Sequence, residues 1–164
     1  MHTLSRSLAL ALIITTTAQA ERPKASLHVG SAIIFPMSFT GKSLTPSTLL
    51  SVIGLVPVSE RWGLIFKGGM ISSLSTFQPA PQLQLGASVK LASRFVLGAT
   101  GIYRYVPHWS GTPSDWHLIG GSLAPTVPLP SKIALAFPIG VAHNLTTHDS
   151  SFSIAFELVF QLPL

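Results

Sequence analysis

Strict alternation of apolar and polar residues at the end of the chain predicts a strand with two different faces. The large apolar residues of this segment share one parity: Phe152, Ile154, Phe156, Leu158, Phe160, Leu162 and Leu164. The other parity holds mostly small or polar residues, with one carboxylate, Glu157. Because neighbouring side chains on a strand point to opposite faces, the segment is expected to be apolar outside and polar inside.

Eight segments of the chain have the pattern and length of strands. Each is near or above the ~9–11 residues that a tilted strand needs to cross a bilayer. An even number of crossings places both ends of the barrel domain on the same side. The segments are Ala25–Phe39, Thr48–Ser59, Trp62–Leu74, Pro81–Ala92, Phe95–Val106, Trp116–Leu129, Lys132–His143 and Ser150–Leu164.

The connections between these segments alternate in length. Three are tight turns with a serine and a basic residue: Ser59–Arg61, Ala92–Arg94 and Pro130–Lys132. Four are longer and rich in Thr, Ser, Pro and Gly: Thr40–Ser47, Ser75–Ala80, Pro107–Asp115 and Asn144–Asp149. Short turns at one end and long loops at the other are typical of outer-membrane barrels, whose short turns lie in the periplasm.

The same two-faced pattern extends to three more segments. Their large apolar residues alternate with glycines, hydroxyls, amides and cations, which places Lys67, Lys90 and Arg104 on the polar faces. The segment Thr48–Ser59 is apolar on both faces, so its register stays open. Pro138 interrupts the middle of another segment, where a proline removes a ladder hydrogen bond.

Charged residues make up only 9% of the chain, against about a quarter in soluble domains. No stretch after the N-terminal region offers the ~18 apolar residues of a membrane helix, so the high mean hydropathy of +0.51 favours membrane strands. The net charge is +5, but the basic residues are scattered singly, which argues against a nucleic-acid partner. The absence of cysteine excludes disulfides and thiolate chemistry.

The N-terminus has the organisation of a secretory signal peptide. Arg6 precedes an apolar run from Leu8 to Ile14, and small residues at Ala18 and Ala20 form a cleavage site. We expect a signal peptide over residues 1–20 and one barrel domain over residues 21–164.

In these features the chain resembles the small eight-stranded outer-membrane barrels of Gram-negative bacteria, although their last residue is usually aromatic and here is Leu164. The resemblance implies an all-β, eight-stranded antiparallel up-and-down transmembrane β-barrel in outer-membrane lipid, inserted from the periplasm by the barrel-assembly machinery. Members of this class act in adhesion, envelope anchoring, small-solute passage or lipid modification. The fold alone does not choose among these roles, and no cofactor is expected.

A narrow barrel of this kind should hold its charges as an internal network. We expect Glu157, Lys67, Lys90, Arg104 and His28 to face the lumen, with Lys67 as the first partner of Glu157, because a lone buried carboxylate is costly. Eight strands leave an interior that side chains about fill. The expected protein is therefore a non-enzymatic envelope or surface-interaction protein with a filled lumen.

Aromatic residues near the ends of the segments predict two interfacial girdles. Trp62 and Phe95 follow short turns, and the second group surrounds a long loop: Tyr103, Tyr105, Trp109 and Trp116.

Two alternatives remain open. A lipid A hydrolase would use the residues around the last long loop, with histidine as base and serine as nucleophile: His143, His148, Asp149, Ser150, Ser151 and Glu157. A soluble periplasmic barrel with an apolar ligand would need polar outward faces. The spacing of the histidines matches no metal-binding motif, so no metal site is expected.

Overall fold

The computed structural model describes residues 24–39, 45–75, 79–108 and 114–163. The signal peptide predicted at residues 1–20, Trp109 and Leu164 lie outside this part of the chain. Within the described residues the chain forms nine strand segments: β1 (Ser26–Ser38), β2 (Ser47–Pro57), β3 (Trp62–Ser73), β4 (Ala80–Ala92), β5 (Phe95–Val106), β6 (Trp116–Leu129), β7 (Ile133–Ala136), β8 (Ile139–Asn144) and β9 (Ser150–Gln161).

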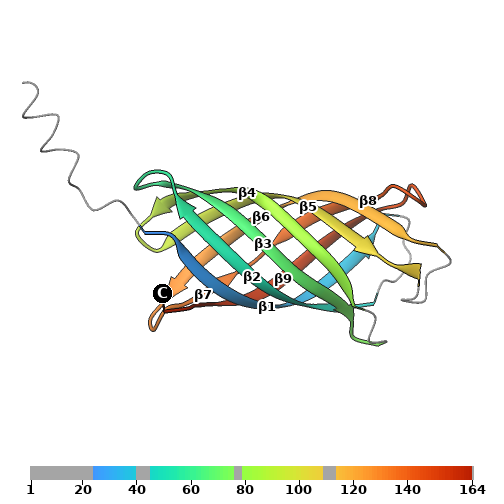
Figure 1. Ribbon diagram of the computed structural model, residues 1–164, viewed down its shortest axis with the longest axis horizontal. Coiled ribbons are helices and arrows are strands. Elements are labelled where there is room, and N and C mark those ends of the chain that lie inside the picture. Colours follow the sequence, from blue (N-terminus) through green and yellow to red (C-terminus); the bar gives the residue numbers. More distant parts are fainter. Residues whose placement is uncertain (1–23, 40–44, 76–78, 109–113, 164) are drawn as a thin grey trace, which may run out of the picture.

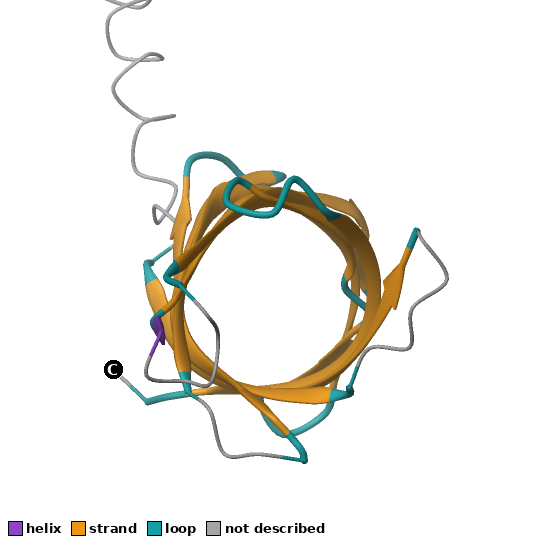
Figure 2. Cartoon of the chain, turned by 90° about the vertical axis from the view of Figure 1, so that its right-hand side faces the viewer, coloured by secondary structure: helices purple, strands orange, loops and turns teal. Residues whose placement is uncertain are grey.

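All strand pairings are antiparallel, and they close into a barrel. Each strand from β1 to β6 pairs with the next, and β1 also pairs with β9, so the sheet has no free edge. Figure 1 shows the tilted strands from the side, and Figure 2 shows the closed ring along the axis. The predicted all-β, antiparallel up-and-down barrel is confirmed.

One wall of the barrel is made by two strand segments in line, β7 and β8. Both pair with β6 on one side and β9 on the other, in a single unbroken register. The gap falls at Pro138, which has no N–H to donate, but its carbonyl still accepts from the Ala155 backbone N–H at 2.8 Å. Proline therefore interrupts the ladder without shifting it, and the barrel keeps eight strands.

The registers also fix the stagger of the barrel. We followed the paired residues from strand to strand around the barrel, starting at His28 on β1. The series of partners returns to β1 at Ser38, ten residues after His28. Such a stagger requires strongly tilted strands. Successive partners therefore lie at increasing heights along the barrel axis. Only the closed barrel fixes which side chains lie at the same height.

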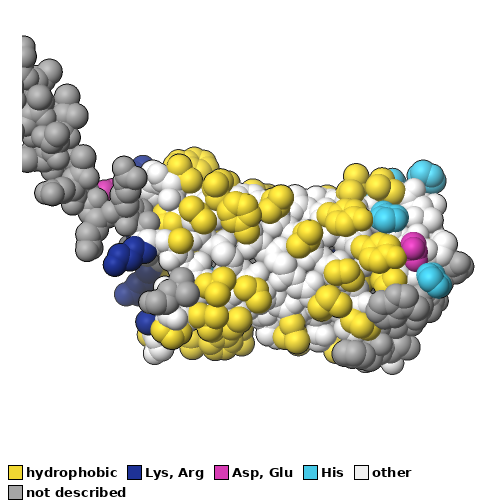
Figure 3. Space-filling model, viewed as in Figure 1, with side chains coloured by type: hydrophobic (Ala, Val, Ile, Leu, Met, Phe, Trp, Pro, Cys, Tyr) yellow, Lys and Arg dark blue, Asp and Glu magenta, His cyan; other side chains and the backbone are white. Residues whose placement is uncertain are grey.

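Large apolar side chains cover the outside of the barrel. Ile33, Leu50, Phe66, Leu85 and Phe156 are between 46% and 66% exposed, and Figure 3 shows such side chains over the middle of the visible face. The inward positions hold smaller or polar side chains. In β2, whose sequence is apolar on both faces, the structure turns Leu49, Ser51 and Ile53 inward and Leu50, Val52 and Val56 outward.

The two ends of the barrel differ in length of connection and in charge. The short turns lie at the end where β1 begins and β9 ends, and the longer loops lie at the other (Figure 1). Exposed cations gather at the short-turn end (Figure 3); we call Lys24, Arg61, Lys90, Arg94 and Lys132 the basic rim. The loop end carries histidines and aspartates. No helix in the described residues is long and apolar enough to span a membrane.

Candidate functional site in the barrel lumen

A buried ion pair lies at the middle of the lumen. Lys67 on β3 points to Glu157 on β9, with Nζ and Oε1 2.5 Å apart and side chains only 8% and 4% exposed. The hydroxyl of Ser51 donates to the same carboxylate oxygen at 3.2 Å. Gly30 provides the space, because a Cβ at this position would lie 2.5 Å from Glu157 Oε1. The pairing confirms the sequence-based prediction of Lys67 as the first partner of Glu157.

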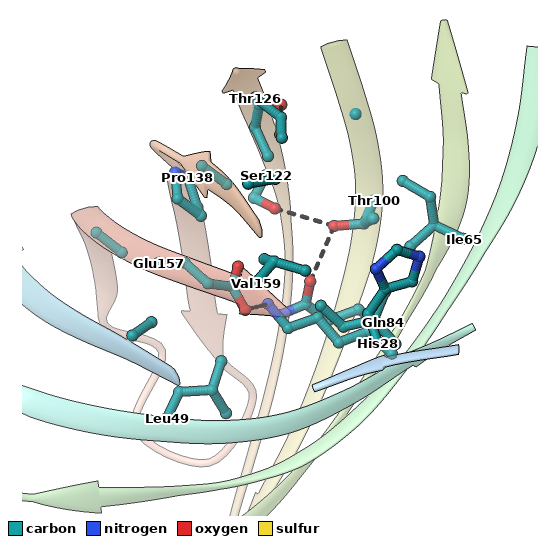
Figure 4. A pocket seen from close by; sticks show the side chains of 18 of the residues that line it. His28, Leu49, Ile65, Gln84, Thr100, Ser122, Thr126, Pro138, Glu157 and Val159 are labelled. Carbon is teal, nitrogen blue, oxygen red and sulfur yellow. Dashed lines mark hydrogen bonds and ion pairs between the residues drawn. The ribbon is translucent and has the colours of Figure 1, made fainter. Parts of the chain in front are cut away.

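A hydrogen-bonded chain crosses three strands on the facing wall. Thr100 on β5 donates to Gln84 Oε1 on β4 at 3.2 Å and shares a 2.9 Å hydrogen bond with Ser122 on β6. Figure 4 shows the three side chains pointing into the lumen opposite Glu157. Thr100 and Ser122 were missed as site residues by the sequence analysis, although Thr100 has the parity of Arg104 on the same strand.

Arg104 occupies the part of the lumen nearer the loops. Its Nε and Nη2 both donate to Gln82 Oε1, at 2.9 and 2.6 Å. The Gln82 side chain is buried and comes from β4, directly opposite Arg104 in the strand register. Arg104 is therefore a lumenal residue, as the sequence predicts, but it hydrogen-bonds an amide and not a carboxylate.

The lumen also contains a cavity of about 430 Å³. The expectation that side chains about fill the lumen is therefore wrong where this cavity lies. The physical reason is the residue size: many inward positions are Gly, Ala, Ser or Thr, which are too short to reach the axis of the barrel. Toward the loops, Val106 packs against a buried apolar cluster: Ala32, Ile34, Leu49, Ile71, Ala80 and Ala155. Several members of this cluster also line the cavity.

The cavity reaches the short-turn end. Its lining includes Leu129 and Lys132 at the turn between β6 and β7, and both are exposed. His28 also lines the cavity and hydrogen-bonds the Ser26 hydroxyl at 2.8 Å, so it is lumenal without joining the ion pair. Lys90 is a correction: it is exposed at the end of β4 and belongs to the basic rim, because its height places it below the lumen.

Outward aromatic side chains lie near both ends of the barrel. Trp62 is 55% exposed close to the short turns, and Phe95 shares the outward parity at the same end. Near the loops, the Tyr103 hydroxyl hydrogen-bonds His117 Nδ1 at 2.9 Å, and the Tyr105 ring lies 5.4 Å from the His117 ring. These residues occupy the positions expected of interfacial girdles.

Trp116 does not belong to the outer girdle. It shares the parity of the lumen-facing Ser122 and Ala124 on β6, and its indole Nε1 is buried without a hydrogen-bond partner among the described residues. The sequence analysis placed Trp116 at the interface because it is near a loop. Its position in the alternation of β6 turns the side chain inward instead. His117, the next residue, takes the outward position.

The outer rim holds two small polar clusters. Asp115 accepts hydrogen bonds from the His108 backbone N–H at 2.7 Å and the Tyr105 hydroxyl at 2.9 Å, and these contacts hold the pKa of the Asp115 carboxyl below its ordinary value. Where β8 and β9 meet the last loop, His143 Nδ1 and Ser150 Oγ are 3.0 Å apart. The His143 side chain is half-buried and Ser150 is exposed. No carboxylate of the described residues hydrogen-bonds this histidine, and Glu157 is bound to Lys67 in the lumen.

The described residues contain no group of three or more His, Asp or Glu side chains placed to hold a metal ion. No protein-family model and no curated protein matches the chain. Among solved structures, a designed transmembrane β-barrel resembles this chain with a TM-score of 0.48 and 12% identity, covering 84% of this chain and 95% of that chain. The fold described above rests on the strand pairing itself.

Proposed function

We propose that this chain is an integral β-barrel protein of the bacterial outer membrane that acts as a non-enzymatic envelope or surface-interaction protein through its outer loops. One observation carries the membrane location: the large apolar side chains are outside the barrel and the ion pair is inside. A water-soluble barrel reverses this arrangement, because exposing such an apolar surface to water is unfavourable. In lipid the same surface needs no compensation, and a closed barrel satisfies all its backbone hydrogen bonds.

The orientation follows from the two ends. The short turns and the basic rim face the periplasm, and the longer loops face outward, as in other outer-membrane barrels. The predicted signal peptide at residues 1–20 would deliver the chain to the periplasm, and the barrel-assembly machinery would insert it. No described residue of the long loops lines the lumenal cavity, which supports a barrel that does not conduct from one side to the other.

A lipid A hydrolase is the second candidate, because His143 and Ser150 are within hydrogen-bond distance near the outer rim. The pair lacks a carboxylate to orient the imidazole, which a serine–histidine mechanism uses to fix the tautomer. Mass spectrometry of lipid A from cells with and without the protein tests this activity. An altered acyl pattern that disappears in Ser150→Ala would replace the non-enzymatic proposal.

The membrane location is tested by fractionation of Gram-negative cells that express the full chain, followed by gel electrophoresis with and without boiling. We expect the protein in the outer-membrane fraction, with a faster band before boiling, because a membrane barrel stays folded in detergent. Recovery in the soluble periplasmic fraction with one heat-independent band would contradict the proposal and favour a soluble barrel.

A further inference from the structure

The lumen contains more positive charge than negative charge among its described residues. Three cations and one carboxylate line the cavity: Lys67, Arg104, Lys132 and Glu157. Lys132 is exposed at the mouth. Lys67 and Glu157 neutralise each other at 2.5 Å. Among the residues that the structure describes, the hydrogen bonds of the Arg104 guanidinium go to the amide oxygen of Gln82. An arginine that is never deprotonated therefore lines the cavity with no carboxylate of the described residues paired to it.

Such an arginine favours an anionic occupant. A partly buried charge without a partner is costly, and an entering carboxylate would accept charge-assisted hydrogen bonds from the guanidinium. Only two of its three nitrogens donate to Gln82, which leaves N–H groups of the planar fork for a second acceptor. Arg104 lines the cavity, so the surface that it retains is accessible to an occupant of the lumen.

The walls between Arg104 and the mouth are mainly apolar. Ile53, Ile65, Val96, Ile102 and Val159 come from four strands and all line the cavity. Figure 4 shows Ile65 and Val159 on the walls of this space, with the polar side chains between them. The cavity volume of about 430 Å³ is in the range of small-molecule sites. An anion without an apolar part would leave most of this wall uncovered.

The direction of entry follows from the two ends of the cavity. Toward the loops, no described residue of the long connections lines the cavity, and Val106 packs against the buried apolar cluster there. Toward the short turns, Leu129 and Lys132 line the mouth and are exposed. A ligand would thus enter from the short-turn end, passing the cationic rim, with its charged group innermost.

We propose that the lumen binds a single-chain amphiphile with a carboxylate head, whose head contacts Arg104 and Gln82 and whose apolar chain lies against the wall toward the short-turn mouth. This site goes beyond the envelope role proposed above and holds whether or not the outer loops have a partner.

The test uses the full barrel domain reconstituted in nanodiscs of zwitterionic phosphatidylcholine, with empty nanodiscs as the blank. Isothermal titration calorimetry compares decanoate with decanol, which has the same chain without the charge, and with acetate, which has the charge without the chain. We expect saturable one-to-one binding of decanoate, and affinities at least about tenfold weaker for both other probes, because each lacks one half of the interaction. Decanol binding as tightly as decanoate, or acetate binding as tightly, would overturn the proposal.

Variants then locate the head group. Arg104→Met should weaken decanoate binding by about tenfold or more and leave decanol unchanged, while Arg104→Lys should recover part of the affinity because it keeps the charge. Arg94→Met removes a cation from the exposed rim and is the matched control. An equal loss in Arg94→Met would show attraction to the rim and contradict the lumenal site. The gel shift on boiling reports whether Arg104→Met folds. If it does not fold, the comparison of decanoate, decanol and acetate on the unmodified chain tests the proposed site.

Discussion

At the scale of single residues, the lumen depends on one ion pair and the space made for it. Lys67 and Glu157 come from strands that are far apart in sequence, and Gly30 leaves room for the carboxylate beside Ser51. In a site with so little exposed surface, breaking such a pair is more costly than removing it entirely, because one charge is left unpaired. The stability of the lumen therefore depends on the pairing of these two charges and on the space beside Glu157.

Glu157→Gln should lower the free energy of unfolding by about 3 kcal/mol, because the Lys67 ammonium loses its counter-charge. Adding Lys67→Met in the same chain should restore part of this loss, since the unpaired charge is then absent. Unfolding by urea in detergent or lipid vesicles measures both effects. Equal stability of the single variant and the wild type would show that the pair contributes nothing.

Gly30→Ala should destabilise the barrel by about 1–3 kcal/mol, because the added methyl group would displace the Glu157 carboxylate and the Ser51 hydroxyl. Gly54→Ala on the adjacent strand is the control: its methyl would meet Phe66 at an ordinary 3.8 Å and should be nearly neutral. The same unfolding measurement compares them. A similar effect of both substitutions would mean that backbone entropy, and not the space beside Glu157, decides the outcome.

Asp115 should titrate below its ordinary pKa of 3.8, because the donors around it favour the carboxylate. Since the folded-state pKa is depressed, its contribution to stability is complete above that value and is lost as the pH falls through the lower, folded pKa. The carboxyl carbon shift in an NMR titration follows it. Tyr105→Phe removes one donor and should move the midpoint back toward 3.8; a midpoint at or above 3.8 in the unmodified chain would refute the loop geometry.

At the scale of strands, parity and depth decide which substitutions the barrel tolerates. Leu85 on β4 is 62% exposed on the outer face, Leu91 on the same strand is 58% exposed beside the basic rim, and Ser88 lines the lumen. One strand thus offers an outward position at mid-height, an outward position near the end and an inward position. Substitutions at these three positions of β4 therefore test whether the outer face contacts lipid.

Leu85→Arg should reduce the stability of the inserted barrel by ~2–4 kcal/mol, since a charge on the lipid face is most costly near the bilayer midplane. Leu91→Arg should cost only about 0–1 kcal/mol near the interface, and the inward Ser88→Arg should also be milder than Leu85→Arg. Equilibrium folding into phosphatidylcholine vesicles gives the three values. Equal costs at Leu85 and Leu91 would argue against a lipid-facing surface at this strand.

At the scale of the whole molecule, the barrel has two unlike ends. One end holds the short turns, the start of β1, the end of β9 and the basic rim. The other end holds the long loops with their histidines and aspartates. The lumen follows the same polarity, because its apolar cluster is toward the loops and its mouth is toward the turns. The proposed orientation in the membrane thus also fixes which compartment reaches the cavity.

Single cysteines test this orientation in a chain that has no other thiol. Thr147→Cys lies in the exposed connection between β8 and β9, and Ser93→Cys lies in the exposed short turn between β4 and β5. A membrane-impermeant maleimide added to intact Gram-negative cells should label the first and not the second, with both labelled after lysis. Labelling of Ser93→Cys alone would invert the proposed topology.

The sequence by itself determined the faces of β3, β4, β5 and β9 and the inward position of Glu157, because alternation is a local property of each strand. It could not place β2, whose faces are equally apolar, nor could it turn Trp116 inward, since nearness to a loop says nothing about direction. Pro138 stays in register only because β6 and β9 hold both halves of the wall.

Height and free volume were decided only by the tertiary structure. The stagger of the closed barrel brings Lys67 level with Glu157 and places Lys90 at the rim, although both lysines lie on the polar faces of their strands. The cavity exists because small inward residues from several strands meet around one axis, while a buried apolar cluster packs toward the loop end. Parity is a property of one strand, whereas height, pairing and empty space are properties of eight strands closed on each other.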